Sequence, residues 1–243
     1  MTALGLLYPG HFAEDDYPRI EQLLAGDIRV DLVHTDVGED AHRTDLLREL
    51  GSPQRLASSA EELRLAGAEA VVWACTSGSF LQGWAGAHEQ VRTLARTAGM
   101  PASSTAFGFV HAVREIGARR VAVAATYPDD VAQEFAAFLR AAGVEVVAVH
   151  GADAGAAAQV ATWGADEVLA LARAGDHADA DAVLIPDTAL HTAAHLTALE
   201  KDLAKPVLTA NQVTVWEALR LVDRRVNAPS LGTLFTREPV VQV

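Results

Sequence analysis

The feature that most constrains the fold is an internal repeat. Short apolar runs alternate with stretches of helical spacing, and the same order starts again in the second half of the chain. Three landmarks recur at a separation of about 110 residues. They are the strands that start at Leu4 and Val121, the residues Cys75 and Asp187, and the prolines Pro101 and Pro206. The sequence therefore predicts two similar α/β lobes of roughly 115 residues each.

Apolar runs and helical spacing locate the expected elements. We expect strands over residues 4–7, 30–33, 70–74, 121–125, 144–149 and 182–185. We expect helices over residues 18–24, 53–65, 81–98, 129–142, 162–173 and 191–203. Alternation of this kind predicts parallel strands joined by right-handed crossovers.

The predicted fold class is thus α/β, with two pseudo-twofold-related lobes, each a parallel four-stranded sheet flanked by helices. Residues 1–117 form the first lobe, which segment 211–243 also closes, and residues 118–210 form the second. Ligands of open parallel sheets bind beyond the carboxyl ends of the strands. Cys75 and Asp187 stand at that end of equivalent strands, so we expect them on opposite walls of an active site between the lobes.

Composition excludes several function classes. The 243 residues are 50% hydrophobic, which gives each lobe enough apolar side chains for a core. A net charge of -13 argues against nucleic acid or a membrane surface as partner, because phosphate binding needs a concentrated basic face. No apolar run reaches membrane-spanning length, and the first twenty positions are rich in charge, so we expect a cytoplasmic protein.

Cys75 is the single cysteine, so it cannot form an internal disulfide. It follows a strand and precedes Thr76, Ser77 and Gly78, which offer hydroxyl groups and a close backbone approach to a ligand. The start of a helix at this point would favour the thiolate. The alternative is an inert, buried small residue, the common state of a free cysteine.

Asp187 occupies the mirror position, and a helix is expected to follow it. There it is either a functional carboxylate or merely the cap of that helix. His191 lies about one turn further on, where it either orients Asp187, lines the pocket or sits on a helix surface. His191 and His195 share the expected helical face, but no third ligand accompanies them, so we expect no metal site.

Residues 73–79, Trp-Ala-Cys-Thr-Ser-Gly-Ser, resemble the first cysteine motif of the maleate cis-trans isomerases. More broadly they resemble the aspartate/glutamate racemase superfamily, which includes arylmalonate decarboxylase. Residues 5–9, 125–131 and 189–192 support the resemblance, which covers nearly the whole chain. It implies a pair of α/β lobes, a small carboxylate substrate, no cofactor, and a homo-oligomer, dimeric or larger.

The resemblance also implies roles for individual residues. Cys75 takes the place of the first-lobe cysteine, and Asp187 takes the place of the second. The carboxylate-binding groups it implies are the side chains of Thr76, Ser77 and Tyr127 and the backbone amides of Thr188 and Ala189.

The chain departs from the family pattern on both walls of the expected site. Racemases use two thiols, and this chain has one. Decarboxylases have a cysteine at the position of Asp187 and a glycine at that of Cys75. Gly10, His11 and Phe12 replace residues with which the isomerases hold a second carboxylate.

Three functions follow from these residues. The first is an isomerase or lyase acting on a small mono- or dicarboxylate, with Cys75 as thiolate and Asp187 as acid or base. The second is an arylmalonate-type decarboxylase with Asp187 as proton donor. The third is a carboxylate-binding or regulatory protein without catalytic activity.

Overall fold

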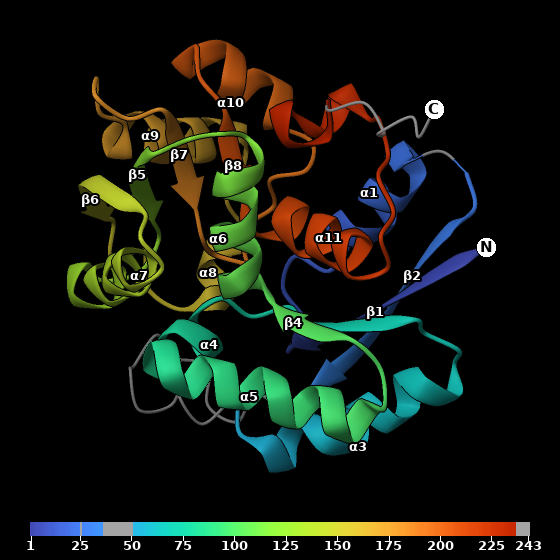
Figure 1. Cartoon of the computed structure of the whole chain (residues 1–243). Helices are drawn as coiled ribbons and strands as arrows, with labels where there is room; N and C mark the ends of the chain where they lie inside the picture. Colours follow the sequence, from blue (N-terminus) through green and yellow to red (C-terminus); the bar gives the residue numbers. More distant parts are fainter. Residues whose placement is uncertain (25, 36–50, 237–243) are drawn as a thin grey trace.

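Two four-stranded parallel sheets form the framework of the molecule (Figure 1). The computed structural model describes residues 1–24, 26–35 and 51–236. The first sheet has the order β2-β1-β3-β4 and the second the order β6-β5-β7-β8. The strands are β1 (Thr2–Pro9), β2 (Ile28–Thr35), β3 (Ala70–Trp73), β4 (Ala102–Ser104), β5 (Arg120–Ala125), β6 (Glu145–Gly151), β7 (Ala182–Ile185) and β8 (Val207–Thr209). The shared strand order confirms the predicted fold class.

Helices flank both sheets. They are α1 (Asp16–Leu24), α3 (Pro53–Leu65), α4 (Ser77–Phe80), α5 (Gly83–Ala98), α6 (Thr105–Glu115), α7 (Asp129–Ala141), α8 (Ala157–Val160), α9 (Ala165–Gly175), α10 (Leu196–Leu203) and α11 (Ala210–Leu221), with short 3₁₀ helices η1 (Pro229–Leu231) and η2 (Thr233–Phe235). Helices α6 and α11 and the four-residue helices α4 and α8 were not predicted. Helices α9 and α10 begin three and five residues later than expected.

The continuous apolar runs form strands because parallel sheets are buried on both faces. Every residue of β1, β3 and β7 is buried. Leu4, Leu6 and Leu7 of β1 are fully buried, as is Trp73 at the end of β3. Among the described residues, no helix is both long and apolar enough to cross a bilayer.

The two lobes are joined by the helices α6 and α11, which follow the last strand of each lobe and pack side by side (Figure 1). Gly108 of α6 permits this approach, because a β-carbon at that position would lie 2.9 Å from the Val213 side chain of α11. The hydroxyl groups of Thr105 and Thr214 lie 2.6 Å apart across the contact. Helix α11 also packs on β3 and β4. These contacts support placing residues 211–236 with the first lobe; the exact lobe boundaries stay a prediction, and residues 237–243 lie outside the described residues.

A buried carboxylate completes the contact between the two helices. Glu217 of α11 accepts hydrogen bonds from Ser103 at 2.6 Å and from Arg220 at 2.7 Å, and its carboxylate lies 3.0 Å from His111 Nδ1 of α6. Burial acts to raise the pKa of the Glu217 carboxyl, but the hydrogen bonds and charges of Arg220 and His111 outweigh it and lower the pKa below its ordinary value. The ionised carboxylate is therefore the form that the fold stabilises.

Glu217→Gln should lower the free energy of unfolding by about 3 kcal/mol at neutral pH, because it leaves the partners of a buried charge uncompensated. The lowered pKa of Glu217 means that the stabilisation is complete above the pKa of the unfolded chain and is lost as the pH falls through the folded value. Urea unfolding at several pH values measures both effects. Glu89→Gln, which removes an exposed carboxylate beside Arg92, is the control. Equal stability of wild type and Glu217→Gln would contradict this assignment.

Candidate active site

Cys75 lies in the loop between β3 and α4, where the backbone folds closely around its sulfur. The amide of Gly78 donates to Sγ at 3.4 Å, and the Ser77 hydroxyl lies 3.7 Å from Sγ. Gly78 is needed for this approach, because a β-carbon there would lie 3.0 Å from the Trp73 ring and 3.2 Å from the Cys75 sulfur. The helix that follows, α4, has only four residues, so its dipole supplies little of the field at the thiol.

The thiol of Cys75 is held as the neutral form, contrary to the expected stabilised thiolate. Burial raises its pKa to about 11, and the negative charge of Asp187 adds to this effect. The Gly78 and Ser77 hydrogen bonds act in the opposite direction but do not compensate. The effect of the loop amides on the thiol pKa is smaller than expected from the sequence, because a fully buried sulfur also loses its contact with solvent.

Asp187 follows β7 and is held on both of its carboxylate oxygens. The Thr126 hydroxyl donates to Oδ2, and the Ala189 amide donates to Oδ1 at 2.9 Å. Asp187 is buried and its charge acts on Cys75 and on Tyr127. The two residues at equivalent strand ends are therefore electrostatic neighbours, as the repeat predicted.

The hydroxyl groups of Thr76 and Tyr127 converge on one acceptor from opposite lobes. Thr76 Oγ1 donates to the Pro186 carbonyl at 2.5 Å, and the Tyr127 hydroxyl donates to the same carbonyl at 3.2 Å. Burial raises the pKa of Tyr127 well above its ordinary value, and the charge of Asp187 raises it further. Tyr127 is therefore a neutral donor. These residues and Ser77 lie together, and two of the hydroxyl groups already bond a carbonyl oxygen.

The segment after Asp187 is irregular, and its polar groups bond to other parts of the chain. The Ala189 amide bonds Asp187, while the Thr188 carbonyl accepts a hydrogen bond from Tyr8 at 2.9 Å. The amides of Thr192 and Ala193 donate to a single carboxylate oxygen of Asp16. These bonds replace the helical ones, which is why the helix expected from residue 191 begins only at Leu196.

His191 points toward the first lobe. Its Nε2 lies 2.6 Å from Asp15 Oδ1, and the expected hydrogen bond to Asp187 is not among its described contacts. Because α10 begins at Leu196, His191 and His195 do not share a helical face.

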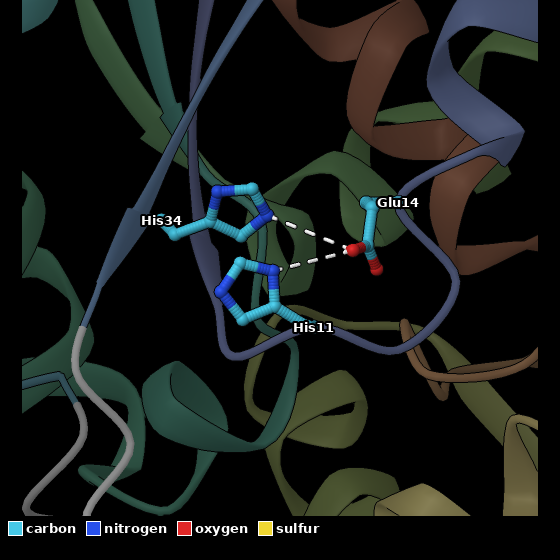
Figure 2. Close-up of side chains that lie close together, drawn as sticks. All are labelled: His11, Glu14 and His34. Carbon is cyan, nitrogen blue, oxygen red and sulfur yellow. Dashed lines mark hydrogen bonds and ion pairs between the residues drawn. The ribbon is translucent and has the colours of Figure 1, made fainter.

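Metal-ligating side chains converge instead at the ends of β1 and β2. His11, Glu14 and His34 bring one ligand atom each to within 4.8 Å of one another (Figure 2). The sequence analysis did not pair the two histidines, because 23 positions separate them along the chain and only the parallel register of β1 and β2 joins them.

Three residues near the site escaped the sequence analysis. Thr126 and Tyr8 bond the Asp187 segment, and Asp16 fixes its far end. The internal repeat carried a signal for one of them. Tyr8-Pro9 ends β1 as Tyr127-Pro128 follows β5, so the repeat aligns Tyr8 with Tyr127, the residue that the family resemblance singles out.

Comparison with known proteins identifies the family. The sequence profile of the arylmalonate decarboxylase family matches residues 52–235. The chain belongs to this family. It is 31% identical over 183 residues to the arylmalonate decarboxylase of Bordetella bronchiseptica, a match that covers 72% of this chain and 75% of that protein. It is also 26% identical over 187 residues to the maleate isomerase of Nocardia farcinica, with 74% of each chain covered.

Solved structures show the same fold. A cysteine-to-serine mutant of the Nocardia farcinica maleate cis-trans isomerase, which carries a covalently bound succinylcysteine intermediate, superposes with a TM-score of 0.88 at 20% identity. The match covers 98% of this chain and 99% of that one. The family profile and the sequence relatives place the chain among the isomerases and decarboxylases of the aspartate/glutamate racemase superfamily, as its cysteine motif predicted.

Asp187→Asn should lower the pKa of Cys75 from about 11, because it removes a negative charge that disfavours the thiolate. Thiolate absorbance near 240 nm, followed against pH, measures this pKa, and Cys75→Ser supplies the blank for the tyrosines. Asp202→Asn, at an exposed carboxylate paired with Arg173, should leave the pKa unchanged. An unaltered thiol pKa in Asp187→Asn would refute the coupling.

Proposed function

We propose that this chain is a cofactor-independent isomerase or lyase acting on a small mono- or dicarboxylate of the maleate type. The observation that carries the proposal is a thiol and a carboxylate buried at equivalent strand ends, Cys75 after β3 and Asp187 after β7. A thiol beside a fixed carboxylate can lose its proton as it attacks, which is how nucleophile and base cooperate in covalent catalysis.

The proposed reaction forms and breaks one carbon–sulfur bond. The Cys75 sulfur adds to one carbon of the substrate double bond while its proton passes to the Asp187 carboxylate. The electrons of the double bond move onto the neighbouring carbon and its carboxylate. After rotation about the resulting single bond, the thiolate leaves, the double bond re-forms as the trans isomer, and the proton returns to sulfur. The covalently bound succinylcysteine intermediate in a cysteine-to-serine mutant of a maleate isomerase supports this route.

The substrate carboxylate would be held by the hydroxyl groups that now converge on Pro186. Thr76 and Tyr127 already donate to one carbonyl oxygen, and Ser77 lies next to the thiol. A substrate carboxylate replaces that carbonyl as their acceptor. The amide of Thr188 is proposed to add a further donor. The amide of Ala189 can bind the substrate only after its hydrogen bond to Asp187 breaks. Neutral hydroxyl donors suit a carboxylate, because they bind it without a competing charge.

Cys75→Ala should abolish the isomerisation of maleate and related small acids, and Asp187→Asn should slow it about 10²- to 10⁴-fold, the usual contribution of a general acid or base. Proton NMR of the substrate and product follows both. Asp202→Asn is the matched carboxylate control. Unchanged turnover of a confirmed substrate by Cys75→Ala would remove Cys75 from the mechanism.

Decarboxylation of a substituted malonate is the second candidate, favoured by the family profile and by the 31% identity to an arylmalonate decarboxylase. In this reaction carbon dioxide leaves and the resulting enediolate takes a proton at its α-carbon. The sequence alone suggested Asp187 as donor. With Asp187 accepting hydrogen bonds on both oxygens and Cys75 held neutral, the thiol is the better donor.

A proton from Cys75 reaches the enediolate from the first lobe, whereas family decarboxylases carry their cysteine on the second. Decarboxylation of a prochiral arylmalonate should therefore yield the opposite enantiomer to that formed by such an enzyme, which chiral chromatography determines. Cys75→Ala should lose this stereochemical preference. The same enantiomer as from the second-lobe enzymes would assign the donor to Asp187, and absence of carbon dioxide release across a panel of arylmalonates would eliminate this function.

A further inference from the structure

A second group of functional side chains lies outside the Cys75 site, where β1 and β2 end. His11 Nδ1 lies 3.3 Å from Glu14 Oε1, and His34 Nε2 lies 3.8 Å from the same oxygen. The two imidazole rings stack with centroids 3.9 Å apart. Figure 2 shows both rings presenting a nitrogen to one carboxylate oxygen. One nitrogen of each ring and one carboxylate oxygen therefore lie within 4.8 Å of one another.

The fold builds this arrangement from three chain segments. The parallel register sets Tyr8 of β1 beside His34 of β2. Gly10, with a φ of 69°, turns the chain after β1 in a conformation that other residues adopt with strain. This turn brings His11 over His34, and Glu14 follows just before α1. The cluster is thus fixed by a strand pair and a glycine turn.

The two nitrogen–oxygen separations are close to those of a transition-metal site, and the nitrogens lie within 4.8 Å of each other. Around a tetrahedral zinc ion bound at about 2.0–2.2 Å, neighbouring ligand atoms lie roughly 3.3–3.5 Å apart. The separations of 3.3 Å and 3.8 Å bracket this range. Two imidazoles and one carboxylate are also a donor set that zinc accepts, with a fourth position open to water or another oxygen ligand.

The other oxygen of the Glu14 carboxylate indicates that this group lacks a full counter-charge. Both imidazoles face Oε1, while Oε2 is shielded from solvent and has no hydrogen-bond partner among the described residues. A buried carboxylate oxygen without a donor is costly unless a charge compensates it. Asp15 and Asp16 follow directly, so the local field attracts cations. The side chains of His11, Glu14 and His34 are 72%, 32% and 35% exposed, which leaves an ion access from solvent.

We infer that His11, Glu14 and His34 form a binding site for one divalent transition-metal ion of the zinc type. The ion takes Nδ1 of His11, Nε2 of His34 and a carboxylate oxygen of Glu14. Tyr8 links the site to the second lobe. Its ring contacts the His34 ring, and its hydroxyl donates a hydrogen bond to the Thr188 carbonyl. It is distinct from the Cys75 and Asp187 pair, and it does not depend on the proposed reaction.

A calorimetric titration of the chelator-treated protein with Zn²⁺ tests the site. Visible absorption of the Co²⁺-loaded protein reports whether the coordination is tetrahedral. Wild type should bind one equivalent. His11→Ala and Glu14→Gln should each lower the affinity by at least the ~10- to 100-fold that loss of an outer-shell partner costs.

His177→Ala is the matched control. His177 is an exposed histidine 4.0 Å from the Asp179 carboxylate, so its loss should leave the affinity unchanged. His11 is largely exposed, so its substitution should preserve folding, which thermal unfolding verifies. Absence of one-equivalent binding by wild type, or equal affinities of wild type, His11→Ala and Glu14→Gln, would overturn the inference.

Discussion

The contact between helices α6 and α11 is the constraint on which the two-lobed arrangement depends. Each helix follows the last strand of its lobe, and the missing side chain of Gly108 lets their backbones approach. The contact encloses Glu217, whose carboxylate is acceptable there only because Ser103, His111 and Arg220 all bond it. With the two helices fixed in this way, the carboxyl ends of both sheets are held face to face, and the loops after β3 and β7 meet.

The two loops contribute chemically different groups to the site, although the lobes that carry them are repeats of one another. The first lobe contributes a thiol, and the second contributes a carboxylate whose two oxygens are both occupied by donors. Two identical groups would exchange roles when a substrate is turned over in either direction. Here the two roles differ from the start. Burial raises the pKa of the Cys75 thiol to about 11, so the thiol holds the proton and the Asp187 carboxylate is the acceptor. This division of roles suits addition with proton transfer to Asp187, or protonation of an intermediate by Cys75, better than a symmetric exchange.

The repeat in the sequence predicted the fold and the pairing of Cys75 with Asp187, because strand order and strand ends follow from periodicity along the chain. Properties that depend on tertiary surroundings were not predictable in the same way. The pKa of Cys75 moved against expectation because burial outweighs the loop amides. The helix expected after Asp187 begins five residues late because Asp16, far away in sequence, accepts two backbone amides of that segment. His11 and His34 became neighbours only through the register of β1 and β2.

Asp16 also bears on how the site can open. One of its carboxylate oxygens accepts the amides of Thr192 and Ala193 and the side-chain amide of Asn211, at 2.8, 3.1 and 3.0 Å. This single buried atom joins the start of α1 to the second lobe and to α11. Pulling the lobes apart would leave the Thr192 and Ala193 amides without their acceptor at once, so a hinge between the lobes is a poor route for substrate entry. Access to Cys75 and Asp187 therefore calls for local rearrangement of side chains and loops, with the two sheets moving as one body.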